Sequence, residues 1–289
     1  MLNIILTILA ILVIILLWVT IYDTNRFIVV KHSFSDKRIR KSMRAVVITD
    51  LHNKSFGRNN ELLLAAIREQ TPDFILVGGD IPTAKPGKSL DIAISFLREL
   101  TKEYTVYYAN GNHEHRMKLY PETYGDMWER YESALKELGV KLLVNEKVEL
   151  PECGLCIYGS EIEKKYYIRF KTAQMDESYM ESILGKKEEK YYNILLAHNP
   201  DYFPQYAVWG ADLVLSGHVH GGMVRIPFWG KGVVSPKVSF FPKYDGGVFR
   251  QGNSTMLLGR GLGMHTIPVR TFNPGELLVV DFLSDGQKA

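Results

Sequence analysis

From residue 45 onwards, short apolar runs alternate with longer amphipathic stretches. The short runs are rich in β-branched residues, which is typical of buried strands, and the longer stretches repeat their apolar positions at helical spacing. The expected strands are 45–49, 74–77, 104–109, 192–197, 212–216, 255–259 and 276–282, and the expected helices are 61–70, 89–100 and 127–138. This alternation predicts an α/β domain whose first half has largely parallel strands.

Two stretches depart from this alternation. Residues 140–159 predict short strands joined by turns. Residues 161–190 are polar, charged and weakly patterned, so we expect a surface excursion with a helix near 175–184. The chain has no internal repeat and no low-complexity segment, and we expect residues 44–289 to form one large domain.

The N-terminal stretch from Leu2 to Ile21 is almost wholly apolar, with three polar interruptions. Twenty helical residues span roughly 30 Å, the thickness of the hydrocarbon layer of a bilayer. Trp18 and Tyr22 lie near one end, where aromatic side chains favour the membrane interface. A cleaved signal peptide and a buried helix are the alternatives. The stretch lacks a basic start and a clean cleavage site, so we expect a retained transmembrane anchor over residues 1–22.

Charge is distributed unevenly along the chain. Residues 23–44 carry seven basic and two acidic side chains, a net of +5, whereas the whole chain carries +3 and residues 1–22 carry no charged side chain. Basic residues that follow a span place the C-terminal domain in the cytoplasm, which predicts a single-pass cell-membrane protein. We expect residues 23–43 to form a basic juxtamembrane linker, either solvated or lying on anionic headgroups. The remainder is slightly acidic, so no nucleic-acid-binding surface is predicted.

Cys153 and Cys156 form the only cysteine pair. A redox motif of the thioredoxin type would open a helix, whereas these cysteines lie between strand-like runs. We therefore expect a hairpin tip with unreactive thiols, and keep a labile local disulfide and redox catalysis as weaker alternatives.

Polar residues with ligand chemistry follow five of the strand-like runs. Because ligand sites of open α/β sheets lie beyond the carboxyl ends of the strands, these residues can converge in space. They are Asp50 and His52, Asp80, Asn112 and His113, His198, and His218 and His220.

This donor set suits a pair of metal ions. With His113 left over, it offers two carboxylates, one amide oxygen and four imidazoles, which suit manganese, iron or zinc. That is too many ligands for one first-row ion and about right for two ions sharing a bridging carboxylate. Two ions about 3.5–4 Å apart polarise a phosphoryl group and activate water, so hydrolysis of a phosphate ester is the expected reaction.

The order of these motifs resembles the calcineurin-like metallophosphoesterases. The motifs are Asp50-x-His52, Gly78-Gly79-Asp80, Gly111-Asn112-His113-Glu114, His198 and Gly217-His218-Val219-His220. The resemblance implies a two-sheet sandwich flanked by helices. The residues after His198 and His220 look most like the bacterial membrane-associated branch, which includes phosphodiesterases and some enzymes that cleave the pyrophosphate bond of UDP-diacylglucosamine. We expect a phosphodiesterase, with pyrophosphate-bond hydrolysis as the alternative.

The resemblance also implies roles for individual residues. One metal would be held by Asp50, His52, Asp80 and His220, and the other by Asp80 as bridge with Asn112, His198 and His218. Manganese is the first expectation, with iron or zinc as alternatives. His113 would lie beside the scissile phosphate and either protonate the leaving group or stabilise its developing charge. Val219 and Met223 depart from the family pattern, but neither is a ligand.

Two further hypotheses concern the kind of substrate and the alternative that the protein is not an enzyme. Residues 225–244 interleave aromatic and aliphatic side chains with Arg225, Lys231, Lys237 and Lys243. They either receive an amphiphilic phosphate ester or simply complete the core. A non-catalytic, membrane-tethered metal-binding scaffold is disfavoured because all the ligands and His113 are intact.

Overall fold

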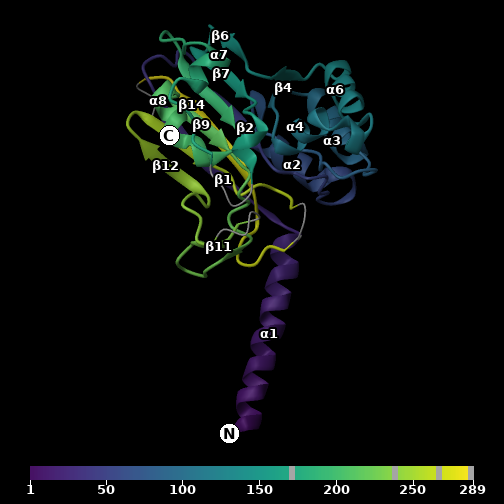
Figure 1. The fold of residues 1–289 in the computed structure, drawn as a ribbon. Coiled ribbons are helices and arrows are strands. Elements are labelled where there is room, and N and C mark those ends of the chain that lie inside the picture. The colour runs from purple at the N-terminus through teal and green to yellow at the C-terminus, as the bar shows by residue number, and fades with distance from the viewer. Residues whose placement is uncertain (169–172, 236–239, 265–268, 286–289) are drawn as a thin grey trace.

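The computed structural model describes residues 1–168, 173–235, 240–264 and 269–285. Its centre is two six-stranded sheets packed face to face (Figure 1). The first sheet has the order β1 (Phe27–Ser35), β14 (Gly275–Leu283), β2 (Met43–Ile48), β3 (Phe74–Val77), β4 (Thr105–Ala109), β5 (Lys141–Leu143). Strands β2 to β5 are parallel, and β14 pairs with β2 in the antiparallel sense.

The second sheet has a parallel centre with an antiparallel strand at each edge. Its order is β12 (Gly247–Gln251), β13 (Ser254–Leu258), β9 (Leu213–Ser216), β8 (Tyr192–Ala197), β7 (Leu155–Ser160), β6 (Glu146–Leu150). A separate small hairpin joins β10 (Val224–Arg225) to β11 (Gly232–Val234). The carboxyl ends of β8 and β9 therefore lie beside each other, as do those of β2, β3 and β4.

Helices cover the outer face of each sheet. Those on the first sheet are α2 (Glu61–Glu69), α3 (Asp91–Thr101) and α6 (Met127–Glu137), and those on the second are α7 (Tyr179–Leu184) and α8 (Phe203–Trp209). The remaining short helices are α4 (Asn112–Leu119), α5 (Pro121–Tyr124), η1 (Arg58–Asn60), η2 (Lys164–Tyr167) and η3 (Pro200–Tyr202). The predicted α/β sandwich with outer helices is confirmed.

Alternation along each strand builds three apolar layers. In β2, Val46 and Ile48 face the helices of the first sheet, while Ala45 and Val47 face the second sheet. The same period of two recurs in β8 and β9, which explains why these strands are apolar at nearly every position, with Asn193 and Ser216 as the polar exceptions. Both faces of each sheet are thus buried, so polar side chains concentrate at the strand ends.

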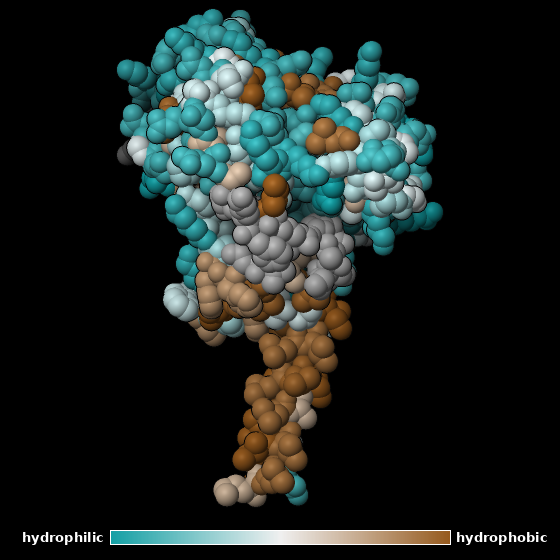
Figure 2. Space-filling model, viewed as in Figure 1, coloured by the Kyte–Doolittle hydropathy of each residue, from teal (hydrophilic) through white to brown (hydrophobic). Residues whose placement is uncertain are grey.

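Helix α1 (Leu2–Thr24) projects from the domain, with its apolar side chains exposed along its whole length (Figure 1, Figure 2). It is long and apolar enough to cross a membrane, a property that signal sequences near an N-terminus share. Within the described part of the chain it is the only helix that meets this test.

The expectation of a linker over residues 23–43 is wrong for 27–35. These residues form β1, which pairs along its whole length with β14 and continues the first sheet. Arg38 within the segment and Arg44 directly after it also form ion pairs with the domain, with Asp212 at 2.8 Å and Asp281 at 2.6 Å respectively. The sequence pattern does not predict this strand because even its inner face is only partly buried, which weakens the alternation of apolar and polar residues.

The predicted hairpin tip at the cysteines is confirmed. Cys153 lies in the turn between β6 and β7, Cys156 is buried in β7, and both thiols are free. Burial raises the pKa of Cys156 to about 11, which makes its thiolate scarce near neutral pH. The helix expected near 175–184 is the shorter α7. Residues 169–172 of that excursion, and Lys237 within 236–239, lie outside the described residues.

Candidate metal centre

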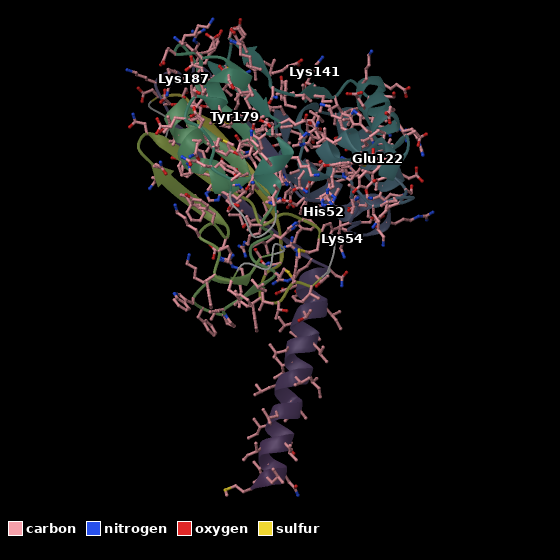
Figure 3. All side chains as sticks on the ribbon, in the orientation of Figure 1. His52, Lys54, Glu122, Lys141, Tyr179 and Lys187 are labelled. Carbon is pink, nitrogen blue, oxygen red and sulfur yellow. The ribbon has the colours of Figure 1, made fainter. Side chains whose placement is uncertain are left out.

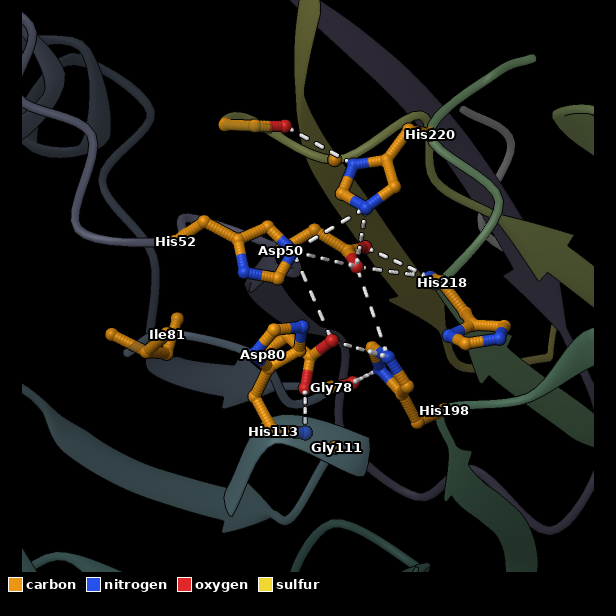
Figure 4. A network of polar contacts seen from close by, with 12 residues as sticks. Asp50, His52, Gly78, Asp80, Ile81, Gly111, His113, His198, His218 and His220 are labelled. Carbon is orange, nitrogen blue, oxygen red and sulfur yellow. Dashed lines mark hydrogen bonds and ion pairs between the residues drawn. The ribbon is translucent and has the colours of Figure 1, made fainter. Parts of the chain in front are cut away.

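The structure brings the predicted ligands of both sheets to one edge of the sandwich (Figure 4). From the first sheet, Asp50 follows β2, Asp80 follows β3, and Asn112 and His113 open α4. From the second sheet, His198 follows β8, and His218 and His220 follow β9. Except for Asn112 and His218, which are partly exposed, these side chains are buried.

One group of donors consists of Asp50, His52 and His220. The Nε2 atoms of His52 and His220 lie 3.3 Å apart. Asp50 Oδ1 lies 3.8 Å from the first nitrogen and 3.6 Å from the second. Two nitrogens bound to one ion at about 2.1 Å and at right or tetrahedral angles lie about 3.0–3.4 Å apart, so this spacing fits a shared ion.

A second group consists of Asp80, His198 and His218, whose donor atoms lie within 4.8 Å of one another. Asp80 Oδ2 lies 3.0 Å from His198 Nε2. The same oxygen lies 3.8 Å from Nε2 of His52, which belongs to the first group. Asp80 thus stands between the two sets of imidazoles.

The second ring nitrogen of two histidines is held by a backbone carbonyl. His198 Nδ1 lies 2.7 Å from the oxygen of Gly78, and His220 Nδ1 lies 3.1 Å from the oxygen of Gly263. A carbonyl can only accept, so each Nδ1 carries a proton, and Nε2 is the ring nitrogen that faces the carboxylates and would bind a metal. This arrangement is usual for histidines that bind metals.

Asn112 and His113 approach the same place from the start of α4. The side-chain oxygen of Asn112 is buried and has no hydrogen-bond partner among the described residues. The backbone amide of His113 donates to Asp80 Oδ1 at 2.8 Å, which fixes the first turn of α4 beside that carboxylate. An amide oxygen left without a donor is a fitting ligand for a hard cation.

The charges of the site are coupled. Burial raises the pKa of Asp50 to about 6. Burial would lower the pKa of His198, but the neighbouring carboxylate of Asp80 outweighs it and raises that pKa to about 10. Burial likewise opposes ionisation of Asp80, but the imidazoles of His198 and His113 hold its pKa well below the ordinary value. The buried carboxylates therefore demand nearby positive charge.

Nitrogen and oxygen donors at these spacings fit divalent metal ions, and no thiolate is among them. The family model for the calcineurin-like phosphoesterases matches residues 43–222, which include every predicted ligand. The chain belongs to the calcineurin-like phosphoesterases.

Relatives of this phosphoesterase occur in several bacteria. The uncharacterised metallophosphoesterase YkuE of Bacillus subtilis is 26% identical over 268 residues, which cover 90% of this chain and 84% of YkuE. An uncharacterised metallophosphoesterase of Campylobacter jejuni is 27% identical and matches 84% of this chain, which spans only 60% of that relative's length. Among solved structures, the sulfate thiohydrolase SoxB of Thermus thermophilus aligns with a TM-score of 0.48 at 16% identity, over 83% of this chain and 56% of SoxB.

The loops of the phosphoesterase that carry the ligands turn sharply. The backbone adopts the left-handed conformation at five of the seven predicted ligands, with φ between 50° and 74°. These are Asp50, His52, Asp80, His218 and His220. This conformation costs a residue with a Cβ on the order of 1 kcal/mol, and such strain clusters where a surrounding structure must aim functional side chains.

Glu114 holds together the two loops of the first sheet that carry Asp80 and Asn112. Its buried carboxylate accepts hydrogen bonds from the backbone amides of Asp80, Ile81 and Gly111, each at 3.0 Å, and from the hydroxyl of Tyr108 at 2.5 Å. Burial and the charge of Asp80 raise its pKa to about 8. The sequence offered a signal for this role, because Glu114 stands three residues after Gly111 at the position that caps a helix start.

A second support holds the loop of His220. Asn273 is buried and donates from Nδ2 to the carbonyl of His220 at 2.8 Å. Arg270 is also buried and donates to the carbonyls of Arg260, Gly261 and Gly263 at 2.8–3.0 Å. The carbonyl of Gly263 also accepts a hydrogen bond from His220 Nδ1, so Arg270 positions this imidazole indirectly.

The polar excursion adds one side chain to the site that no sequence signal marked. Tyr167 of η2 packs against His218 with ring centroids 5.4 Å apart and an edge-to-face geometry. Burial raises the pKa of this tyrosine well above its ordinary value, so it stays a neutral wall of the site. Residues 161–190, expected to be a surface excursion, therefore contribute Tyr167 to the site.

Proposed function

We propose that this phosphoesterase hydrolyses phosphate diesters with two divalent ions. Asp50, His52, Asp80 and His220 would hold one ion, and Asp80, Asn112, His198 and His218 the other. The observation that carries the proposal is the position of Asp80, whose Oδ2 faces an imidazole of each set at 3.8 Å and 3.0 Å. When bound, such a pair of ions polarises the phosphoryl group and makes water acidic enough to attack near neutral pH.

The tautomer of His113 supports one of its two expected roles. The backbone amide of Ala84 donates to His113 Nδ1 at 2.8 Å, so that nitrogen is an acceptor and the proton sits on Nε2. A neutral imidazole that gave up this proton would become an imidazolate, which is a strong base. His113 therefore acts by donating a hydrogen bond to the phosphoryl or leaving oxygen, and stabilises its developing charge without transferring the proton.

Manganese is the ion we propose for both positions. The donor set mixes carboxylate and amide oxygens with imidazoles, which manganese accepts readily, whereas zinc favours four-coordinate sites. Iron fits the same donors, so metal analysis of the purified protein is the test of this choice.

The test is hydrolysis of bis(p-nitrophenyl) phosphate by the full chain in detergent micelles with manganese supplied. Asp80→Ala is expected to lose turnover together with bound metal, measured by elemental analysis. Asp281→Ala is the matched control, because Asp281 pairs with Arg44 away from the site. Hydrolysis of a monoester alone would refute the diester proposal, and full turnover by Asp80→Ala would refute the assignment of the bridge.

We further propose that α1 is a retained single-pass anchor with the domain on the cytoplasmic side. The domain uses the end of this helix: Asp23 is buried and accepts from the amide of Asn273 at 3.0 Å, and Thr24 accepts from the amide of Arg270 at 3.1 Å. Cleavage of a signal sequence after Thr24 would remove these contacts, and cleavage just after Ile21 would leave Asp23 and Thr24 at a new chain end. The intact mass of the mature protein tests whether α1 is retained. Fluorescence of a C-terminal green fluorescent protein fusion tests whether the domain lies on the cytoplasmic side of the membrane.

A further inference from the structure

The turn of the β10–β11 hairpin carries large apolar side chains that are exposed. Phe228 and Trp229 lie at the tip, and Trp229 is 71% exposed. Phe240 and Phe241 lie next to β11, to which they are joined by a bridge from Val234 and a hydrogen bond to Val233, and both are exposed. We name Phe228, Trp229, Phe240 and Phe241 the aromatic patch. The hypothesis that these aromatics complete the core is wrong for all four.

The hairpin is attached directly to the segment that receives α1. The amide of Arg225 in β10 donates to the carbonyl of Thr271 at 3.0 Å, and the amide of Thr271 donates to Met223 at 3.1 Å. The hydroxyl of the same threonine lies 2.8 Å from the hydroxyl of Thr20 in α1. Thr271 therefore bridges β10 and the helix, and β11 lies at the end of the domain from which α1 projects (Figure 1).

The contact with Thr20 fixes the level of the hairpin along the helix. Twenty residues of a helix cross about 30 Å of hydrocarbon, so an apolar stretch that begins at Leu2 leaves the hydrocarbon near Ile21. Trp18 and Tyr22 stack at this level with ring centroids 5.4 Å apart, as aromatic side chains do at a membrane interface. Thr20 lies between them, so the hairpin is held at the height of the interface.

We propose that the aromatic patch is a second membrane contact, which inserts into the interface of the bilayer that α1 spans. The proposal rests on the proposed anchor. Hydrophobic residues gather on the edge of the domain beside α1, continuous with the helix itself (Figure 2). Lys231 and Lys243 flank the aromatic side chains and are exposed, and such basic residues complement anionic headgroups.

This contact would set the distance of the metal centre from the lipid. Val224 follows His220 by four residues, and the guanidinium of Arg225 donates to the carbonyl of Gly221 at 2.8 Å. On the other side of the site, Lys54 donates to Asn25 at the end of α1 at 2.8 Å. Figure 3 shows His52 and Lys54 at the end of the domain nearest the helix. The hairpin and α1 thus hold the loops of both ligand groups close to the membrane surface.

Quenching of tryptophan fluorescence by brominated lipids tests the proposal on the full chain in phosphatidylcholine and phosphatidylglycerol vesicles. Trp128 and Trp209 are buried in the domain, so Trp18 and Trp229 are the informative reporters. The difference between Trp18→Phe and the double variant Trp18→Phe, Trp229→Phe isolates Trp229. We expect its emission to be lost when bromine lies near the headgroup end of the acyl chain, and to be retained when bromine lies at the bilayer centre.

Two further variants make the outcomes distinct. Val208→Trp, placed in the double variant, reports an exposed tryptophan on α8, away from α1, and is expected to show no quenching (Figure 1). Trp229→Phe alone leaves Trp18, which reports the anchor. If Trp18 is quenched and Trp229 is not, the membrane contact of the aromatic patch is refuted and the proposed anchor stands. The same holds if cross-linking shows that Trp229 contacts a second copy of the chain. Unquenched Trp18 overturns the proposed anchor as well, while diester hydrolysis is measured separately.

Discussion

Gly217→Ala should disable the metal centre without unfolding the protein. Gly217 directly follows β9, and a Cβ at this position would lie 2.2 Å from Asp50 Oδ2. The same carboxylate accepts two hydrogen bonds of 3.0 Å from the amide of His218, and Asp50 is fully buried. The backbone of Gly217 has an ordinary φ, so an alanine there meets the carboxylate and no conformational strain.

The size of the effect follows from the overlap. Contacts of a Cβ shorter than 3.0 Å are essentially never found, so the carboxylate of Asp50 must move by about 0.8 Å. Metal sites hold their ligand distances to about 0.2 Å. Misplacement of a reacting group by about 1 Å costs on the order of a hundredfold in rate. We therefore expect kcat/KM to fall about a hundredfold, which corresponds to about 2.7 kcal/mol of transition-state stabilisation.

The assay is hydrolysis of bis(p-nitrophenyl) phosphate over a manganese titration, with thermal unfolding as the check on folding. Gly259→Ala is the matched control, because Gly259 ends the neighbouring strand with an ordinary φ and its added Cβ would be 3.2 Å from its nearest neighbours. The control is expected to keep near-normal turnover. Wild-type kcat/KM and manganese affinity in Gly217→Ala would refute the reasoning, because the position of the Asp50 carboxylate would then be irrelevant to catalysis.

Three further predictions concern the supports of the site and its ions. Glu114→Gln leaves at least one of four buried donors without an acceptor, and should lower the free energy of unfolding by about 1–3 kcal/mol in urea titrations and weaken metal binding. Asn273→Ala removes the hydrogen bond that Nδ2 donates to the carbonyl of His220, and calorimetric titration should show weaker manganese binding with an otherwise folded domain. Chelation should remove about 4 kcal/mol of stabilisation from protein held at a thousandfold excess of ion over Kd, seen as a lower Tm; an unchanged Tm would contradict the metal assignment.

The sequence was most informative where both faces of a strand are buried. In β2, β3, β8 and β9 most positions are buried and apolar, so the polar residues that closely follow each strand mark both the strand end and the candidate ligands. Short connections then leave one way to assemble parallel strands, and their carboxyl ends converge. This is why residues as distant as Asp50 and His220 could be assigned to one site.

The sequence was least informative at partly buried edges and for support contacts. β1 alternates weakly because none of its residues is fully buried, so its pattern predicts a linker. The contact of Tyr167 with His218 depends on how a polar excursion folds back, which no periodicity encodes. The sequence does not predict the exposure of Trp229. A large apolar side chain usually lies in the core, and only the packing of the hairpin turn shows that this one does not.

Only Asn25 and Arg26 separate the end of α1 from the start of β1. A flexible connection of two residues would reach about 8 Å, and here Arg26 is further held by its ion pair with Asp23 at 2.7 Å. With α1 in a bilayer, the domain cannot wander on a tether in search of dissolved molecules. It moves with its helix, and its encounters with substrates in the same membrane are governed by lateral diffusion in two dimensions.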